Sequence, residues 1–266
     1  MPEGHSIHRY ASEHREALSG QLITASSPQG RFSRGAARLN GRKLLDVEAH
    51  GKHLFYRWQR AETLHIHLGL YGRFRTFRSD PPPPTPNTRL VLSTDDVYIY
   101  LAGPTVCELI DPTRKEAIRA RLGPDPLRVG TDGNTAAVFA ANLVRRTIPI
   151  GSAVLDQSVI AGIGNIYRSE TLFLTGIDPA TPANEVTPEK IDELWAKSAE
   201  LLARGVAEGK IVTVDRRAPR TRHLERHDDL HVYQRERFPC RRCGGPISHG
   251  EMANRRIWWC ASCQTS

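Results

Sequence analysis

Four of the five cysteines stand in two pairs near the C-terminus, at a spacing that could hold a metal ion. Cys240, Cys243, Cys260 and Cys263 follow the pattern C-x2-C-x16-C-x2-C, and two thiolates two residues apart fit adjacent corners of a Zn2+ tetrahedron. Protein would fill all four positions, so the ion would have none open for chemistry. The spacing predicts one structural zinc that holds the last thirty residues, which have too few apolar positions for a core of their own.

The residues behind the initiator methionine could do covalent chemistry. With Met1 removed, Pro2 carries a free secondary amine, and an α-amino group with a pKa near ~8 is partly unprotonated at neutral pH. An amine can attack an electrophilic sugar carbon and form a Schiff base. The carboxyl group of Glu3 could protonate the leaving group or the ring oxygen. The pair fits cleavage of a glycosidic bond; the alternative is that "MPEG" only favours removal of the methionine and starts a helix.

Two further segments could bind an anion such as a phosphate. In "GIGNIYRSE", Gly162 and Gly164 break one helical pattern before another begins at Asn165, and such a turn exposes backbone N–H groups at a helix N-terminus. The full dinucleotide-binding fingerprint is absent. Arg255 and Arg256 lie between the cysteine pairs, where a rigid hairpin could present either one to a phosphate. The alternative is a solvated turn, and the spacing of the residues alone does not distinguish a phosphate-binding hairpin from such a turn.

The charge balance favours a polyanionic partner. The chain has 37 basic and 29 acidic side chains, a net charge of +8 and a pI near 9.5, which is typical of nucleic-acid binding. Only six of the basic residues are lysines; an arginine bias can also reflect a GC-rich genome. Residues 214–227 carry five arginines and two histidines, as either a solvated loop or a flexible basic loop near nucleic acid.

The elements that must position these residues fall into two parts. Residues 4–19 have the apolar spacing of a helix, and seven short segments rich in β-branched and aromatic residues follow between 21 and 102, which predicts a β-sandwich or barrel. Glycine and proline break the chain over 122–134. Beyond this boundary Thr187 resembles an N-cap, with Pro188 at the first helical position. We expect a sandwich with an N-terminal helix, then a helical domain and a metal-bound hairpin.

Several of these motifs occur together, in this order, in one known family. "PEG", "GKHLF", "GIGNIYRSE", "HVYQRERFPCRRCGGPI" and "RRIWWCASCQ" resemble the formamidopyrimidine-DNA glycosylase / endonuclease VIII family over Pro2 to Gln264. The resemblance implies a bifunctional DNA glycosylase and abasic-site lyase of base-excision repair, which flips a damaged base out of duplex DNA. It also implies an α+β chain with a catalytic β-sandwich domain over 1–124, a linker over 125–134, a helix–two-turns–helix domain over 135–230 and a zinc finger over 231–266.

The resemblance assigns catalytic roles to residues of the first domain. Pro2 would be the nucleophile at the sugar C1′, and Glu3 would be the general acid. Lys52 in "GKHLF" matches the family lysine that approaches the DNA phosphates around the lesion. We therefore group Lys52 with the catalytic residues.

The resemblance also assigns residues that bind DNA in the second domain. Asn165 matches the asparagine of the helix–two-turns–helix motif that grips a phosphate. Arg255 stands five residues before the third cysteine, where the family has its zinc-finger arginine, so it is favoured over Arg256 as a catalytic and DNA-binding residue. Glu170 matches an acidic position of the family, and we expect it to be a structural support.

The segment "HLGLYGRFR" bears on the substrate. Leu70 and Tyr71 resemble the endonuclease VIII wedge that fills the hole left by the flipped base. Gly69 stands where endonuclease VIII has glutamine, the Arg-x-Phe wedge of the other branch is missing from "LAGPTVCELI", and His5 departs from the usual residue after "PEG". The balance favours oxidised pyrimidines. Oxidised or ring-opened purines are the alternative substrate class.

The remaining expectations concern partners and location. The alternative to an enzyme is a non-catalytic damaged-DNA-binding protein on the same scaffold, but binding alone would require neither Pro2 nor Glu3. No apolar run approaches the ~18 residues of a membrane span, and the first twenty residues are too charged for a secretory signal. We expect a monomer in the bacterial cytoplasm, nucleoid-associated when it is bound to damaged double-stranded DNA.

Overall fold

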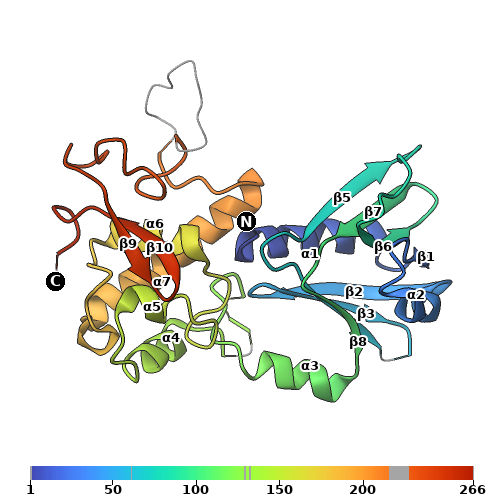
Figure 1. The fold of residues 1–266 in the computed structure, drawn as a ribbon. Helices are drawn as coiled ribbons and strands as arrows, with labels where there is room; N and C mark the ends of the chain where they lie inside the picture. The colour runs from blue at the N-terminus through green and yellow to red at the C-terminus, as the bar shows by residue number, and fades with distance from the viewer. Residues whose placement is uncertain (1, 61, 129, 132, 216–227, 266) are drawn as a thin grey trace. The chain divides into compact units, whose positions relative to one another are not determined.

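The computed structural model describes residues 2–60, 62–128, 130–131, 133–215 and 228–265. The chain divides into two compact units, Met1–Ala120 and Arg121–Ser266, and Figure 1 shows the elements of each. The division falls just before Gly123 and Pro124.

The first unit is a β-sandwich that carries the N-terminal helix. Its strands are β1 (Leu22–Ser26), β2 (Arg42–His50), β3 (His53–Trp58), β4 (Thr63–His67), β5 (Arg73–Arg78), β6 (Thr88–Ser93), β7 (Val97–Ala102) and β8 (Val106–Ile110). They follow the order β5-β7-β6-β1-β2-β3-β4-β8. Residues 22–23 of β1 pair with β2 and residues 24–26 pair with β6, so this one short strand passes from one layer to the other.

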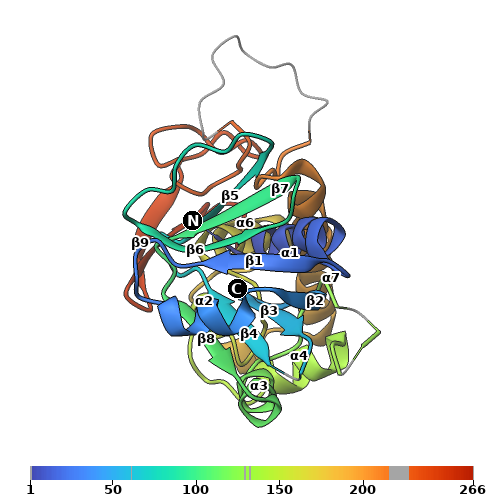
Figure 2. The same cartoon turned by 90° about the vertical axis from the view of Figure 1, so that its right-hand side faces the viewer.

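Helix α1 (Gly4–Leu18) lies between the β5–β7 layer and the β2–β3 layer in both views (Figures 1 and 2). Its buried residues Ile7, Ala11, His14 and Leu18 recur at three- and four-residue intervals, which is the period of one helical face. Two short helices, α2 (Ser33–Leu39) and α3 (Pro112–Arg119), complete the unit. The sequence patterns had indicated α1 and seven strands, but not α2, α3 or β8.

The second unit is helical and ends in a hairpin. It contains α4 (Ala136–Leu143), α5 (Ile150–Ala153), α6 (Asn165–Thr175), a 3-10 turn at Ala183–Glu185 and α7 (Pro188–Glu208), followed by β9 (Ser248–Met252) and β10 (Arg255–Trp259). Thr187 accepts a hydrogen bond from the Lys190 amide, so the predicted N-cap of α7 is confirmed. The hairpin and the loop before it pack on α6 in one apolar cluster that includes Phe173, Val232, Ile247 and Trp258. The predicted α+β fold class is confirmed.

Within the described residues, no helix is both long enough and apolar enough to cross a membrane.

Histidines are buried in the first unit, and their surroundings favour the neutral imidazole. Burial lowers the pKa of His14 to about 3, helped by the charge of Arg9; its ring lies 2.6 Å from the hydroxyl of Tyr56 through Nδ1. Burial is likewise the largest cause that lowers the pKa of His53 to about 3 and of His67 to about 4. The folded unit therefore resists protonation at these sites.

We expect the first unit to lose stability in mild acid. The unfolded chain binds protons at these histidines near their ordinary pKa of 6.5, before the folded chain does. The stability is therefore fully present above about pH 6.5 and is lost as the pH falls towards the folded values. Calorimetry should show a lower melting temperature at pH 5 than at pH 7. His14→Gln, which cannot titrate, should reduce that difference; equal melting temperatures of the parent at both pH values would contradict the expectation.

Candidate active site and nucleic-acid interface

Pro2 and Glu3 stand at the N-terminal end of α1. Glu3 is the N-cap residue, with an extended backbone, and its carbonyl accepts hydrogen bonds from the amides of Ser6 and Ile7 at 3.0 and 3.3 Å. Its side chain is completely buried, whereas Pro2 is half-buried. The positive end of the helix dipole favours a carboxylate at this position. Pro2 and the buried carboxyl group of Glu3 thus lie next to each other at a helix N-terminus.

Contacts along α1 fix the direction in which this end points. Tyr10 packs edge-on against Phe74 near the start of β5, with ring centroids 5.0 Å apart, and His14 packs against the same ring at 4.7 Å. Further along the helix, Ala17 lines a cleft together with Arg78 at the far end of β5. Helix α1 therefore runs in the same direction as β5. Its N-terminus points to the end of the unit where β5 begins.

The loop before β5 carries the predicted wedge residues. Leu70 is 46% exposed and Tyr71 is 85% exposed, so two apolar side chains project into solvent. Gly69 has φ +67°, and a Cβ on it would lie 1.9 Å from Thr105 Oγ1. Only glycine fits that backbone without displacing Thr105. A glutamine at this position would be strained in this backbone and would collide with Thr105.

Lys52 lies in the two-residue turn between β2 and β3. His50 and His53 pair across this turn, and Gly51 has φ +57°, as the first central residue of a type II′ hairpin turn does. His53 also pairs with His67 at the end of β4, so the Lys52 turn and the wedge loop lie at the same end of the sheet. Since α1 points to that end, the structure gathers Pro2, Glu3, Lys52, Leu70 and Tyr71 there.

Sequence reasoning missed a row of histidines at this end. His53 Nδ1 lies 2.8 Å from His65 Nε2, and His65 Nδ1 lies 3.0 Å from Glu108 Oε1. His67 Nδ1 accepts a hydrogen bond from the Gly69 amide at 3.2 Å. A neutral His67 that accepts at Nδ1 carries its proton on Nε2. The alternating histidines of "TLHIH" were the available signal, because positions two apart share one face of a strand.

In the second unit, Asn165 is the first residue of α6 and lies against the hairpin. Gly164 precedes it as the N-cap residue. The Gln157 side chain ties down the turn before it, donating to the Ile163 carbonyl and accepting from the Gly162 amide. Asn165 Nδ2 donates to the Arg256 carbonyl at 2.9 Å. The glycine-rich turn, the helix N-terminus and the hairpin therefore meet at one point.

Arg255 is the first residue of β10, directly after the hairpin turn. Ala253 and Asn254 form that turn with φ values of 53° and 56°, the left-handed pair of a type I′ turn. The side chains of Arg255 and Arg256 are both exposed, while Trp258 packs inward and donates from Nε1 to Glu236 Oε2 at 2.8 Å. The tryptophan anchors the hairpin, and the arginines remain at its surface.

Glu170 is a structural support, as expected. Its completely buried carboxylate accepts hydrogen bonds from the backbone amides of His231, Val232 and Tyr233 at 2.8–2.9 Å, and from the Thr213 hydroxyl. It holds the loop that leads from α7 into the cysteine-containing hairpin. The contacts satisfy the carboxylate with protein donors.

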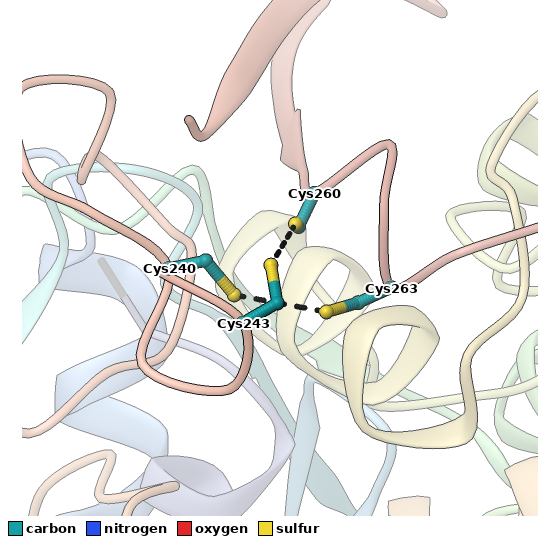
Figure 3. A group of neighbouring side chains, drawn as sticks. All are labelled: Cys240, Cys243, Cys260 and Cys263. Carbon is teal, nitrogen blue, oxygen red and sulfur yellow. Dashed lines mark hydrogen bonds between the residues drawn. The ribbon is translucent and has the colours of Figure 1, made fainter. Parts of the chain in front are cut away.

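The four cysteines form a cluster that fits one zinc ion. Their sulfur atoms all lie within 4.8 Å of one another (Figure 3); the pair Cys240–Cys263 is separated by 3.8 Å and the pair Cys243–Cys260 by 3.5 Å. A tetrahedron with Zn–S bonds of about 2.3 Å needs a separation of roughly 3.8 Å. The amides of Arg242 and Gly245 donate to sulfurs of the first pair, and the Gly245 bond is the main cause that lowers the pKa of Cys243 to about 7. The predicted structural zinc site is confirmed by this geometry.

The arginines of the basic stretch, Arg216 to Arg226, lie outside the described residues, so the two interpretations of that stretch stay open.

Comparisons with known proteins agree with the fold and the cluster. Residues 122–216 match the formamidopyrimidine-DNA glycosylase H2TH domain family, and residues 1–114 match the formamidopyrimidine-DNA glycosylase N-terminal domain family. The chain is 39% identical to endonuclease 8 1 of Mycobacterium tuberculosis over the whole of both chains. It is 32% identical to formamidopyrimidine-DNA glycosylase of Thermus thermophilus, over 99% of this chain and 98% of the relative.

Solved structures of other proteins have a similar fold. The complex between Lactococcus lactis Fpg and DNA with an abasic site has a TM-score of 0.82 at 24% identity, covering 99% of this chain and all of that one. Together the fold, the cysteine cluster and the full-length relatives define a DNA glycosylase with abasic-site lyase activity, acting in base-excision repair. The chain belongs to the formamidopyrimidine-DNA glycosylase / endonuclease VIII family.

We expect the zinc to be needed for the fold of the hairpin. Cys240→Ser should lower the zinc content well below one ion per chain and the soluble yield, because a structural site supplies on the order of 10 kcal/mol to folding. Metal analysis and limited proteolysis of the hairpin measure this. Cys107→Ser, a matched change in the first unit, should keep its zinc. A stable, fully metallated Cys240→Ser protein would exclude the structural role.

Proposed function

We propose that this chain removes an oxidised base from double-stranded DNA through a Schiff base on the Pro2 amine, and then cleaves the strand. The observation that carries the proposal is that the Pro2–Glu3 pair directly precedes α1, whose N-terminus points to the end of the first unit that bears the Lys52 turn and the wedge loop. A nucleophile, an acid, a cation and an apolar wedge are the groups that base flipping followed by covalent capture requires.

The proposed chemistry follows from these two groups. The lone pair of the unprotonated Pro2 amine attacks C1′ as the base departs with the electrons of its glycosidic bond. The nitrogen, now bonded to C1′, releases its own proton to water, which restores its lone pair. Glu3 supplies a proton to the departing base or to the ring oxygen, and water protonates the other; the ring oxygen then leaves C1′ with its bonding electrons as the nitrogen lone pair forms the iminium. The iminium acidifies the C2′ hydrogen; its loss expels the 3′ phosphate and cuts the strand. Water then hydrolyses the Schiff base and releases the amine.

DNA binding in this proposal depends on residues of both units. Lys52, Asn165 and Arg255 would bind phosphates around the lesion, where charge-assisted hydrogen bonds to phosphate oxygens fix the register of the duplex. The exposed Leu70 and Tyr71 would fill the space left by the flipped base. Apolar wedges of this kind replace lost base stacking. We infer that the chain acts as a monomer in the bacterial cytoplasm, as its bacterial relatives suggest.

Oxidised pyrimidines are the favoured substrates in this proposal. The support is the endonuclease 8 relative at 39% identity, against 32% for the formamidopyrimidine-DNA glycosylase relative, and the "LYG" sequence of the exposed loop.

Trapping with borohydride tests the nucleophile. The parent protein, with removal of Met1 verified by mass, should form a covalent adduct with DNA that contains one abasic site, because borohydride reduces the Schiff base to a stable amine. Pro2→Ala should lose most of the adduct. Glu3→Gln should keep the trapping but lose base excision at least a hundredfold. No adduct from correctly processed, zinc-loaded parent would favour a non-catalytic DNA-binding protein instead.

Competing lesions test the substrate. Excision of 5-hydroxyuracil should be at least tenfold faster than excision of 8-oxo-G in the same duplex sequence, measured in single turnovers. Leu70→Ala should weaken binding of both duplexes with unchanged zinc content, because the wedge serves either lesion. The reverse ratio of rates would support the purine alternative.

A further inference from the structure

A charged side chain is buried at the centre of the second unit, one helical turn after Asn165. Arg168 is completely shielded from solvent on α6. A guanidinium removed from water needs hydrogen-bond acceptors, because an unsatisfied buried charge costs several kcal/mol, and both terminal nitrogens of Arg168 have them. The groups that satisfy it are therefore fixed in place by the same requirement.

The hydrogen bonds of Arg168 join three segments of the unit. One terminal nitrogen donates to the carbonyls of Gly151 on α5 and Met252 on β9, at 3.3 and 3.2 Å. The other donates to Asn165 Oδ1 at 2.5 Å and to the Arg256 carbonyl at 2.9 Å. All of these acceptors are neutral oxygens, and two of them lie on either side of the hairpin turn.

These contacts decide which way the Asn165 amide faces. A guanidinium can only donate, so the oxygen of the amide turns towards Arg168 and its NH2 group turns away. One N–H of that group donates to the Arg256 carbonyl; no described residue accepts from the second N–H, which can therefore donate to a ligand. The reversed amide would offer a carbonyl oxygen in its place, which repels a phosphate. Arg168 thus selects the orientation in which Asn165 is a donor.

The same contacts seat the hairpin turn that carries Arg255. The Arg168 guanidinium binds the carbonyls of Met252 and Arg256, which flank the Ala253–Asn254 turn. Gly151 permits a close approach on this side, since a Cβ there would lie 2.7 Å from Met252 Sδ. The backbone that leads to Arg255 is therefore held against α5 and α6 from inside the unit.

We propose that Arg168 is a positioning residue for DNA binding: its buried guanidinium sets the donor orientation of Asn165 and seats the Arg255 turn, so that both bind phosphate as one unit. The inference rests on the proposed function, in which Asn165 and Arg255 bind phosphates. Arg168 itself is buried among protein carbonyls and acts only through these two residues.

Double-mutant cycles on full-length, zinc-loaded protein test the proposal. The probe is a duplex with one tetrahydrofuran abasic analogue, and dissociation constants are measured over a series of salt concentrations. Arg168→Met should weaken binding about tenfold and lower the log–log salt slope by up to about one, as loss of the Arg255 contact does. In combination with Asn165→Ala or Arg255→Ala alone, Arg168→Met should cost less affinity than it does in the parent, and in the variant that carries both alanines it should add less than twofold.

Two further variants separate positioning from folding and from net charge. Arg168→Lys keeps one donor for Asn165 Oδ1 but cannot span the hairpin carbonyls, so it should bind with intermediate affinity; it carries the same cycles if Arg168→Met does not fold. Arg204→Met, on the exposed face of α7 where Arg204 pairs with Glu200, is the matched loss of one charge. It should leave the affinity within twofold of the parent.

The outcomes distinguish this inference from the proposed function. Losses at Arg168 that are fully additive with those at Asn165 and Arg255, or an unchanged affinity in Arg168→Met, would overturn the positioning role while the phosphate contacts stand. If Asn165→Ala and Arg255→Ala both bind as the parent does, the phosphate roles in the proposed function fail, and the positioning role fails with them.

Discussion

The second unit depends on two opposite charges buried in one helix. Every residue of α6 except Leu174 is buried, yet the helix carries Arg168 and Glu170. The arginine binds the tip of the hairpin and the carboxylate binds the loop that enters it. Removing either side chain would leave the neutral groups it binds without a hydrogen bond in the interior, which costs about 1–3 kcal/mol for each group. Hydrogen bonds therefore attach both the tip of the hairpin and the loop before it to α6. Between these two points, apolar packing and the four-cysteine site stabilise the hairpin.

The first unit positions its groups by packing rather than by buried charge. Helix α1 is enclosed between two sheet layers, and its ring contacts with Phe74 set its direction. The turn at Lys52 and the loop at Leu70 are placed by the register of β3 and β4. The histidines at this end have lowered pKa values and serve as neutral hydrogen-bonding groups. A one-residue slip of β4 would reverse its faces and move His67 away from Gly69.

The sequence allowed the site to be predicted where residue type alone dictates chemistry. The cysteine spacing predicted the zinc cluster, and the helical period and strand patterns predicted α1, α7 and most of the sandwich. Strand β8 was not predicted because four of its five residues are half-buried, so its sequence lacks the alternation of apolar and polar residues that marks a strand with one buried face. Helix α2 is only seven residues long. The role of Arg168 was not predicted because a single arginine three residues after Asn165 forms no recognisable sequence motif. Only the tertiary structure shows that its charge is buried.

The hairpin turn is held in its left-handed conformation before any DNA is present. Ala253 and Asn254 both have positive φ, which is unfavourable for alanine, and the backbone around them is bound to α6. A free loop would have to be ordered at the moment of binding, which lowers affinity for every phosphate contact it makes. In this protein the turn is already ordered, so the entropy loss is part of the free energy of folding and not of binding. The turn can therefore meet a ligand without first being ordered, so rearrangement of this turn should not limit the rate of association.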